Sequence, residues 1–485
     1  MLPIEAGMMS VVVMVVSLVL TILLIVKVKI NPVYAMLVGA IGAGIAFGIP
    51  LEPTPLLDPV TMQPTGATQP GVLQVVITGF GNTIGNIGIV ILLGTTIGVI
   101  LEQTGGALVL ANSILKLVGR KRSALAMALS GYLVSIPVFS DTAIVIMAPV
   151  ARTVSARSGT PQIACLGALN AGIMATHTIT PPTPGPLAAA GTLGVDLGLM
   201  IVLGLIVAFV YTMFALVWVT SKACVRRFPE PSKIEGVEAL VDENDFTIKS
   251  DKKLPGAGVT FACLLVPIFL ICFNSFGRIA PVAAAAEGLS HPLQPFLPLM
   301  SFFGHPIMAL GIGVVMCFFL DTKMTSIEQI GKWFNKSIDV SAFIILATGT
   351  AGSYGFMLRE SQVGEFMGKA IAETNLPVIF IPFLVTMLLV LSNGSATVSL
   401  ITGSAIMLPL LPFLGLHPVM VALALTAGAS FFYHVNASHY WVVVRSANMT
   451  MREGFFNVSG GTAIGSIGAM VAVFILNLIV GPMLG

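Results

Sequence analysis

Charged side chains are scarce in this sequence. Of its 485 residues only 9% are Asp, Glu, Lys or Arg, whereas an ordinary soluble domain carries about 25%. Hydrophobic residues make up 56% of the chain, which is more apolar surface than one soluble core can bury. These values exclude a water-soluble globule, a disordered tail and a coiled coil. The apolar runs are long and continuous and lack the ~10-residue alternation of barrel strands, so we expect an all-α polytopic membrane protein.

Cysteine and enzyme motifs are also scarce. None of the five cysteines forms a CxxC pair, and four lie in apolar runs, so we expect reduced packing residues rather than disulfides or metal ligands. The sequence has no HExxH zinc helix and no paired-acid motif of an intramembrane enzyme. The formal net charge of +2 provides no broad basic field for nucleic acid. We therefore expect a protein that is not an enzyme, needs no cofactor and binds no nucleic acid.

The placement of Lys and Arg predicts the topology, because these residues concentrate at the cytoplasmic ends of spans. The first uncharged run, 8–26, is followed by Lys27 and Lys29 and is expected to be an inward-running span and not a cleaved signal peptide. The hydrophilic segment 222–255 is expected to be a cytoplasmic connector. It separates an N-terminal membrane repeat, 1–221, from a C-terminal membrane repeat, 256–485.

Two apolar segments are interrupted by polar residues and are predicted to be re-entrant hairpins. Segment 123–151 has basic residues at both ends, so both ends are expected on the cytoplasmic side. Crossing and recrossing the hydrocarbon takes roughly 40 residues, and this segment is shorter. Such backbone must be buried in protein or line a cavity. Segment 376–414 contains a similar polar break and is predicted to be a second hairpin that enters from the outside.

The two halves repeat the same order of elements. His177 and His434 are 257 residues apart, as are the Gly-x-x-Leu motifs that begin at Gly98 and Gly355. Each motif is followed by an amphipathic stretch, a hairpin and a span that breaks just after the histidine. We predict two inverted-topology repeats, each with five spans and one hairpin. This is a plan of secondary transporters, in which the substrate lies near the midplane at discontinuous helices.

The polar breaks supply the candidate site. Helix N-termini at these breaks carry partial positive charge and free N–H groups, which suit a carboxylate. The predicted spans contain no Lys or Arg, which favours a small, singly charged, hydrophilic substrate over a polyanion. The candidate substrate-binding residues are Ser140, Thr142, His177, Thr178, Thr180, Ser392, Asn393, Gly394, Ser395, Thr397, His434, Asn436 and Ser438.

Three of the polar residues are candidates for coupling transport to protons. Asp141 is an acid inside an apolar segment, and such an acid marks a functional site by default; the alternative is that it caps a helix. His177 and His434 are candidate proton relays or ligand contacts, or else satisfied buried histidines at structural breaks. His439 is either a further site residue or a polar contact between helices.

Several short motifs resemble the gluconate permease family of the ion-transporter superfamily. They are Leu101 to Gly106, Gly119 to Arg122, the proline-rich break His177 to Pro186, Gly394 to Val398, and His434-Val435-Asn436 with Trp441. The sequence departs from the family pattern at Phe139-Ser140-Asp141, where the family has Phe-Phe-Glu, and at Ala437, where the family has Asp. The resemblance implies an elevator-type scaffold and transport domain, and a homodimer.

The expected function is therefore secondary active transport. We expect a symporter in the plasma (inner) membrane that imports a small hydrophilic organic anion, such as gluconate or a related sugar or hydroxy acid, together with protons. Its partners are that anion, the coupling ion, the lipid bilayer and a second copy of the chain. Three alternatives stay open: a sodium-coupled carboxylate transporter of the same superfamily, a transporter of a small amino acid such as D-serine, and a channel.

Overall fold

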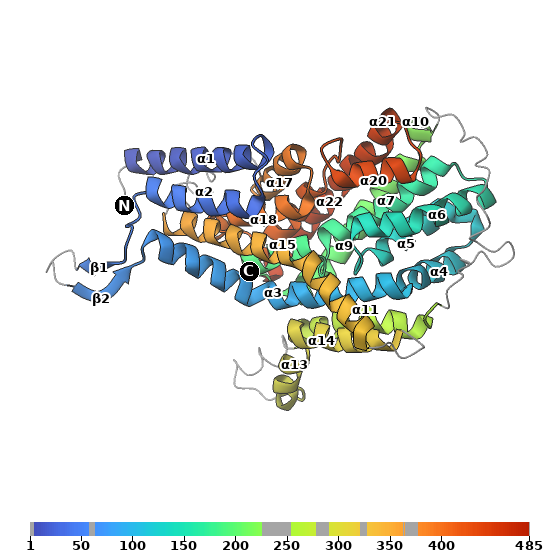
Figure 1. Ribbon diagram of the computed structural model, residues 1–485, viewed down its shortest axis with the longest axis horizontal. Helices are drawn as coiled ribbons and strands as arrows, with labels where there is room; N and C mark the ends of the chain where they lie inside the picture. Colours follow the sequence, from blue (N-terminus) through green and yellow to red (C-terminus); the bar gives the residue numbers. More distant parts are fainter. Residues whose placement is uncertain are drawn as a thin grey trace.

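The computed structural model describes residues 4–57, 64–225, 254–277, 291–320, 327–361, 363 and 377–484. Nearly all of this part of the chain is helical (Figure 1). Six of its helices are long and apolar enough to cross a membrane, and a seventh span is present if a bent pair counts as one. The expectation of a helical membrane protein is thereby confirmed. Most of the predicted connector, 222–255, lies outside the described residues.

The N-terminal half contains ten helices longer than one 3₁₀ turn and one small sheet among the described residues. In chain order its elements are α1 (Ile4–Val26), α2 (Pro32–Ala46), β1 (Thr54–Leu57), β2 (Pro64–Gln69), α3 (Val72–Thr104), α4 (Gly106–Val118), the 3₁₀ turn η1 (Arg120–Arg122), α5 (Ser123–Val134), α6 (Ser140–Ser158), α7 (Gln162–Ile179), α8 (Pro184–Leu193), α9 (Leu197–Thr220) and α10 (Lys222–Val225). The strands β1 and β2 pair antiparallel and lie in the chain between α2 and α3.

The C-terminal half follows a similar order. Its elements are α11 (Ala257–Gly277), η2 (Gln294–Phe296), α13 (Leu297–Phe303), α14 (Pro306–Cys317), η3 (Phe318–Leu320), α15 (Ile327–Glu360), α17 (Phe380–Asn393), α18 (Ala396–Met407), η4 (Leu411–Phe413), α19 (Pro418–Ala429), α20 (Ser438–Ser446), α21 (Met451–Gly454), the π-helical turn η5 (Phe455–Ser459), α22 (Gly460–Ile479) and α23 (Gly481–Leu484).

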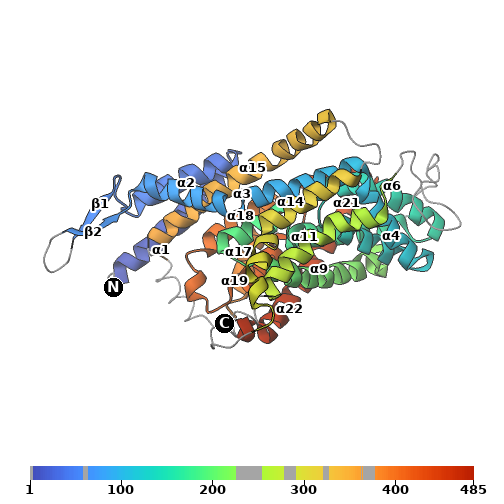
Figure 2. The same cartoon turned by 90° about the horizontal axis from the view of Figure 1, so that it is seen from below.

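Two long helices, α3 and α15, pack along each other through the middle of the protein (Figures 1 and 2). They have 33 and 34 residues, which corresponds to about 50 Å of helix each. Glycines allow the close approach, because a Cβ atom on Gly79 would lie 2.8 Å from the Cα atom of Ser353. The Ser353 hydroxyl donates to the carbonyl of Val76 at 2.8 Å. Helix α2 packs on α15, and α14 packs on α3.

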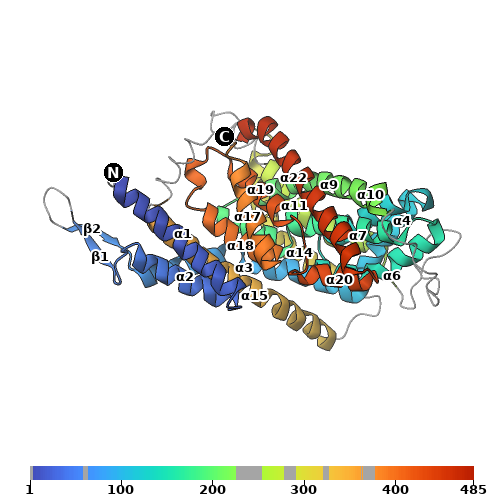
Figure 3. The same cartoon turned by 90° about the horizontal axis from the view of Figure 1, so that it is seen from above.

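The shorter helices form a second group beside this pair. Helix α5 packs on α7, α17 packs on α19, and α9 packs on α22 (Figure 3). Small residues again set the spacing: a Cβ atom on Gly172 would lie 1.9 Å from the carbonyl oxygen of Ala128, and one on Gly428 would lie 2.1 Å from that of Phe383. Two helices of this group, α8 and α18, pack against α3 and α15 respectively.

The segment 294–320 is bent. The helices on either side of the break make an angle of 59°. Pro306 begins α14 and cannot donate a backbone hydrogen bond, while the His305 side chain accepts from the backbone N–H of Ile307 at 3.3 Å. Gly304 lies so close to α11 that a Cβ atom there would be 2.2 Å from the Cβ of Asn274. These local features end one helix and begin the next.

Candidate functional site

Four helices begin inside the second group of helices and their N-termini lie next to one another. At the start of α8, a Cβ atom on Gly185 would lie 3.3 Å from the Cα of Thr397, at the start of α18. Directly before α18, a Cβ atom on Gly394 would lie 2.5 Å from the carbonyl oxygen of Asn436, two residues before α20. Asp141, in the first turn of α6, contacts the first turn of α20. The four N-termini are therefore linked by contacts from α8 through α18 and α20 to α6.

Three of these four helices lack a side-chain cap. The N-cap residues Phe139, Thr183 and Ala437 make no side-chain hydrogen bond to the first turns of α6, α8 and α20. At α18 the hydroxyl of Ser395 accepts from the backbone N–H of Val398 at 3.4 Å. First-turn N–H groups have no partner within their own helix, and together with the helix dipole they attract an anion. In α8 the residues Pro184 and Pro186 carry no N–H group, so Gly185 supplies the free N–H group of that turn. The cluster therefore suits a carboxylate.

Asp141 is the exposed end of a chain of polar side chains that joins three helices. Its Oδ1 atom lies 2.8 Å from Nδ1 of His439, and Nε2 of His439 lies 2.8 Å from Oδ1 of Asn170 on α7. The Asp141 side chain is 49% exposed and that of His439 only 5%. We had left His439 open and had not considered Asn170. The available signal was the single amide, Asn170, within the apolar run 163–175 of α7.

The break between α7 and α8 contains polar atoms without partners. Nδ1 of His177 and Oγ1 of Thr180 are buried and have no hydrogen-bond partner among the described residues. The His177 ring lies 6.3 Å from that of Phe139, at the start of α6. In contrast, the hydroxyl of Thr178 donates to the carbonyl of Met174 in its own helix, at 2.7 Å. His177 and Thr180 are thus available to a ligand, whereas Thr178 is satisfied locally.

The turn between α17 and α18 is closed by its own side chains. Oδ1 of Asn393 accepts from the backbone N–H of Ser395 at 2.7 Å, and Nδ2 of Asn393 donates to the hydroxyl of Ser399 at 3.1 Å. The hydroxyl of Ser392 donates to the carbonyl of Leu389 at 2.8 Å. Gly394 has a φ of +72°, which favours glycine. Asn393 and Gly394 therefore shape the turn.

Two predicted site residues connect this turn to the break before α20. Nε2 of His434 lies 3.1 Å from the carbonyl oxygen of Leu391, and Nδ2 of Asn436 donates to the same oxygen at 2.9 Å. Because a carbonyl only accepts, Nε2 of His434 carries a hydrogen here. Both side chains hold the end of α17. Among the other candidates, Ser140 and Thr142 lie in the first turn of α6, Thr397 in that of α18 and Ser438 in that of α20.

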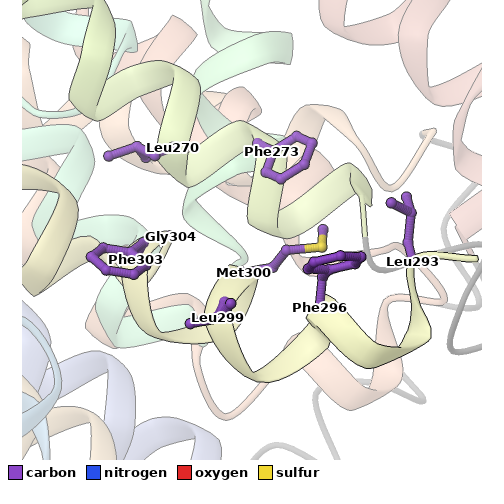
Figure 4. A pocket seen from close by; sticks show the side chains of 8 residues that line it. All are labelled: Leu270, Phe273, Leu293, Phe296, Leu299, Met300, Phe303 and Gly304. Carbon is purple, nitrogen blue, oxygen red and sulfur yellow. The ribbon is translucent and has the colours of Figure 1, made fainter.

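An apolar pocket of about 480 Å³ lies elsewhere, between α11 and α13 (Figure 4). Its walls include Phe273 from α11 and Phe296, Met300 and Phe303 from the neighbouring bent pair. All of its lining residues are apolar, so it does not suit a hydrophilic anion. Among the described residues, no group of three or more His, Cys, Asp or Glu side chains could hold a metal ion.

Comparisons with known proteins agree over nearly the whole chain. The GntP family permease model matches residues 9–479. An uncharacterized permease of Haemophilus influenzae is 33% identical over 427 residues, which are 87% of this chain and 82% of that protein. A gluconate permease of Pseudomonas aeruginosa is 29% identical and covers 94% of this chain and 95% of its own length. The D-serine transporter DsdX of Escherichia coli is 27% identical, with 96% and 97% covered.

A solved structure shares the fold. Neisseria gonorrhoeae MtrF superposes with a TM-score of 0.66 at 15% identity, covering 94% of this chain and 96% of that one. The likeness therefore concerns the arrangement of the helices and not the substrate. The family match over residues 9–479 confirms the resemblance seen in the short motifs, and six helices are able to cross a membrane: the chain belongs to the GntP family of permeases and is a multi-pass membrane transport protein.

Proposed function

We propose that this permease is a proton-coupled symporter of the inner membrane that imports a small hydrophilic organic anion, such as gluconate or a related sugar acid. The observation that carries the proposal is the meeting of four helix N-termini, three of them without side-chain caps. Their N–H groups would bind the carboxylate. The hydroxyls of Ser140, Thr397 and Ser438, in the first turns of three of these helices, would bind the hydroxyl groups of the substrate.

D-serine is a second candidate substrate. Like gluconate, D-serine carries a carboxylate. The D-serine transporter DsdX matches nearly the whole of this chain. The half-exposed carboxylate of Asp141 would pair with its ammonium group.

We propose that the chain consists of two inverted repeats, 1–221 and 256–485, joined by the connector 222–255. The supporting observation is the spacing of helix boundaries. Helices α5 and α17 begin 257 residues apart, at Ser123 and Phe380, which is the distance that separates His177 from His434. The pairs α6 and α18, α7 and α19, and α3 and α15 begin within two residues of the same offset. On this proposal α5–α6 and α17–α18 are the two re-entrant hairpins.

We propose further that a transport domain (α5–α9 and α17–α22) slides along a scaffold (α1–α3, α11 and α13–α15). The support comes from two glycines at equivalent positions of the repeats. A Cβ atom on Gly98 of α3 would lie 2.1 Å from the carbonyl oxygen of Pro137, at the tip of the first hairpin. On Gly355 of α15 it would lie 3.1 Å from the carbonyl oxygen of Ala405, well beyond the tip of the second hairpin.

The difference between these contacts gives the distance of the slide. Pro137 and Gly394 are 257 residues apart and therefore occupy equivalent positions in the two repeats. Ala405 lies 11 residues after Gly394, which corresponds to a distance along the helix of about 16 Å at about 1.5 Å per residue. Both hairpin tips are thus displaced toward the Gly98 end of the scaffold, which the basic residues after α4 mark as cytoplasmic. In the proposed outward-facing state, each repeat makes the contact that the other repeat makes here. Gly98 would then lie beside Ala148, and Gly355 would lie beside Gly394.

We propose Asp141 as the carrier of the coupling proton. Its side chain is half exposed, so water can reach it, and it lies in the first turn of α6 beside the proposed carboxylate site. His177 offers a buried nitrogen without a partner as a second proton-binding group. His434 is a further candidate, although its contact with the Leu391 carbonyl also anchors the second hairpin.

We propose that the protein forms a homodimer through the scaffold.

Uptake by the purified protein in liposomes tests the function. Radiolabelled gluconate should accumulate inside when the interior is made alkaline, and one pH unit should support up to about tenfold accumulation if one proton accompanies each anion. Unlabelled sugar acids, hydroxy acids and D-serine, added as competitors, rank the substrates. Liposomes without protein and a proton ionophore are the controls. Uptake that responds to an imposed sodium gradient and ignores the pH gradient would contradict proton coupling, and conductance without saturation would indicate a channel.

A further inference from the structure

His439 is placed to bind a proton that neutralises Asp141. Both of its ring nitrogens face oxygen atoms: Nδ1 lies 2.8 Å from the Asp141 carboxylate and Nε2 lies 2.8 Å from Oδ1 of Asn170. A neutral imidazole has one N–H group and can donate to only one of these oxygens, whereas an imidazolium donates to both. As arranged, the pocket around His439 therefore fits the protonated ring. Rotation of the Asn170 amide by a half turn would present its NH₂ group and fit the neutral ring.

The other ionisable groups around His439 leave Asp141 as its principal partner. The ring of Tyr433 lies 6.2 Å from that of His439, and its hydroxyl is directed to the carbonyl of Ala429. Cys165 and His177 are the titratable groups on α7. The basic residues of α6 and α20 lie toward the C-terminal ends of these helices, and one base and one acid lie on α21; these residues are Arg152, Arg157, Arg445, Arg452 and Glu453. Arg152 donates to the carbonyl of Ser446 at the far end of α20.

The charge of the Asp141–His439 pair depends on one proton. With an imidazolium at His439 the pair is neutral as a whole, and with a neutral ring it carries one negative charge. Both residues lie in the first turns of the uncapped helices α6 and α20, where the substrate carboxylate is proposed to bind. A net negative charge at this place repels that carboxylate, and a neutral pair does not.

We propose that His439 is the second half of the proton site: it shares the coupling proton with Asp141 and is held in position by Asn170. This inference rests on the proposed proton-coupled uptake of an anion. A proton from the outside adds to the imidazole and completes both hydrogen bonds, so that the anion binds to an uncharged pair. After the transport domain has moved, the proton leaves through the exposed carboxylate of Asp141 to the cytoplasm. Proton and anion therefore bind together, which couples their transport.

The decisive measurement is the pH dependence of gluconate affinity in the purified, full-length protein. If one proton binds with each anion, the KM of the unmodified protein should rise about tenfold per pH unit once the pair has lost its proton. His439→Gln keeps a side chain that can hydrogen-bond to Asn170 but cannot titrate. Because the Asp141 charge is then no longer neutralised, this variant should show a raised KM that is independent of pH, and it should no longer accumulate gluconate in response to a pH gradient. His305→Asn is the matched control, because it changes a helix-capping histidine of the scaffold.

A second variant keeps the inference testable if His439→Gln does not fold. Asn170→Asp preserves the shape of the side chain and places a second carboxylate against His439, so the fall in affinity should begin at a higher pH. Persistence of gradient-driven accumulation and of the pH slope in His439→Gln would overturn the role of His439, as would an unshifted profile in Asn170→Asp. If the unmodified protein itself shows no response to a pH gradient, the proposed proton coupling fails, and the variants are not needed to reach that result.

Discussion

The proposed sliding of the transport domain can be tested with two pairs of engineered cysteines. Gly355→Cys with Ala405→Cys joins residues that already touch, since a Cβ atom on Gly355 would lie 3.3 Å from the Cα of Ala405. Gly98→Cys with Ala148→Cys is the equivalent pair of the other repeat, 257 residues earlier. The tip residue Pro137, not Ala148, contacts Gly98 in the structure. In the proposed slide, the first pair reports the state described above, which would face inward, and the second pair reports the outward-facing state.

The expected separation follows from the helix geometry. Ala148 lies 11 residues beyond Pro137, so it should be about 16 Å from the Gly98 contact, at about 1.5 Å per residue. A disulfide requires Cα atoms roughly 4.4–6.8 Å apart. The second pair consequently cannot form a disulfide unless the domain slides by more than about 9 Å. A Cβ atom on Gly98 would also lie 2.1 Å from the Pro137 carbonyl oxygen, which disfavours the inward-facing state in this variant.

The assay uses a background in which the five native cysteines are replaced and uptake is retained. Oxidation is followed by the gel mobility of a chain cleaved between the two cysteines of a pair, within 119–122 for the pair at 98 and 148 and within 364–376 for the pair at 355 and 405. Uptake is measured before and after reduction. Each pair should form a disulfide, and each disulfide should stop net uptake until it is reduced. Single-cysteine variants are the controls. Disulfide formation by the first pair alone, in a protein that transports actively throughout, would refute the slide.

Two further substitutions test the hairpins. Asp141→Asn removes the proposed proton carrier with little change in shape, so accumulation driven by a pH gradient should be lost while gluconate exchange persists; undiminished accumulation in liposomes would exclude Asp141 as the carrier. Gly394→Ala places a side chain at a φ of +72°, which costs roughly 1–2 kcal/mol, and brings its Cβ within 2.5 Å of the Asn436 carbonyl oxygen. It should lower the thermal unfolding temperature and abolish uptake, and a protein with unchanged melting and uptake would show that this contact is not needed.

Much of the helical plan could be predicted from the sequence, because apolar length and charge placement are direct consequences of the bilayer. The first hairpin was expected at 123–151, and α5 begins at Ser123. Helix α6 continues to Ser158, past the basic residues that set the expected end. It ends before Gly159, whose φ is +74°. Within the helix, Arg152 donates to the carbonyl of Ser446, a contact between distant parts of the chain that no local pattern reveals.

The details that escaped prediction depend on packing between distant segments. The bend before Pro306 arises where Gly304 meets α11, and the partner of Asp141 lies 298 residues away, at His439. His177 and His434 were treated alike, yet one has an unpaired buried nitrogen and the other binds a carbonyl. Periodicity and charge place helices in the membrane, but they do not specify which polar side chains face each other.

The most direct experiment is a structure of the protein with gluconate bound, determined in a lipid nanodisc. The substrate carboxylate is expected within hydrogen-bond distance of first-turn backbone N–H groups of at least two of the helices α6, α8, α18 and α20, with its hydroxyl groups directed to side chains of the same turns. Density for gluconate in the apolar pocket between α11 and α13, or at any place remote from these four helix ends, would contradict the proposed mode of recognition.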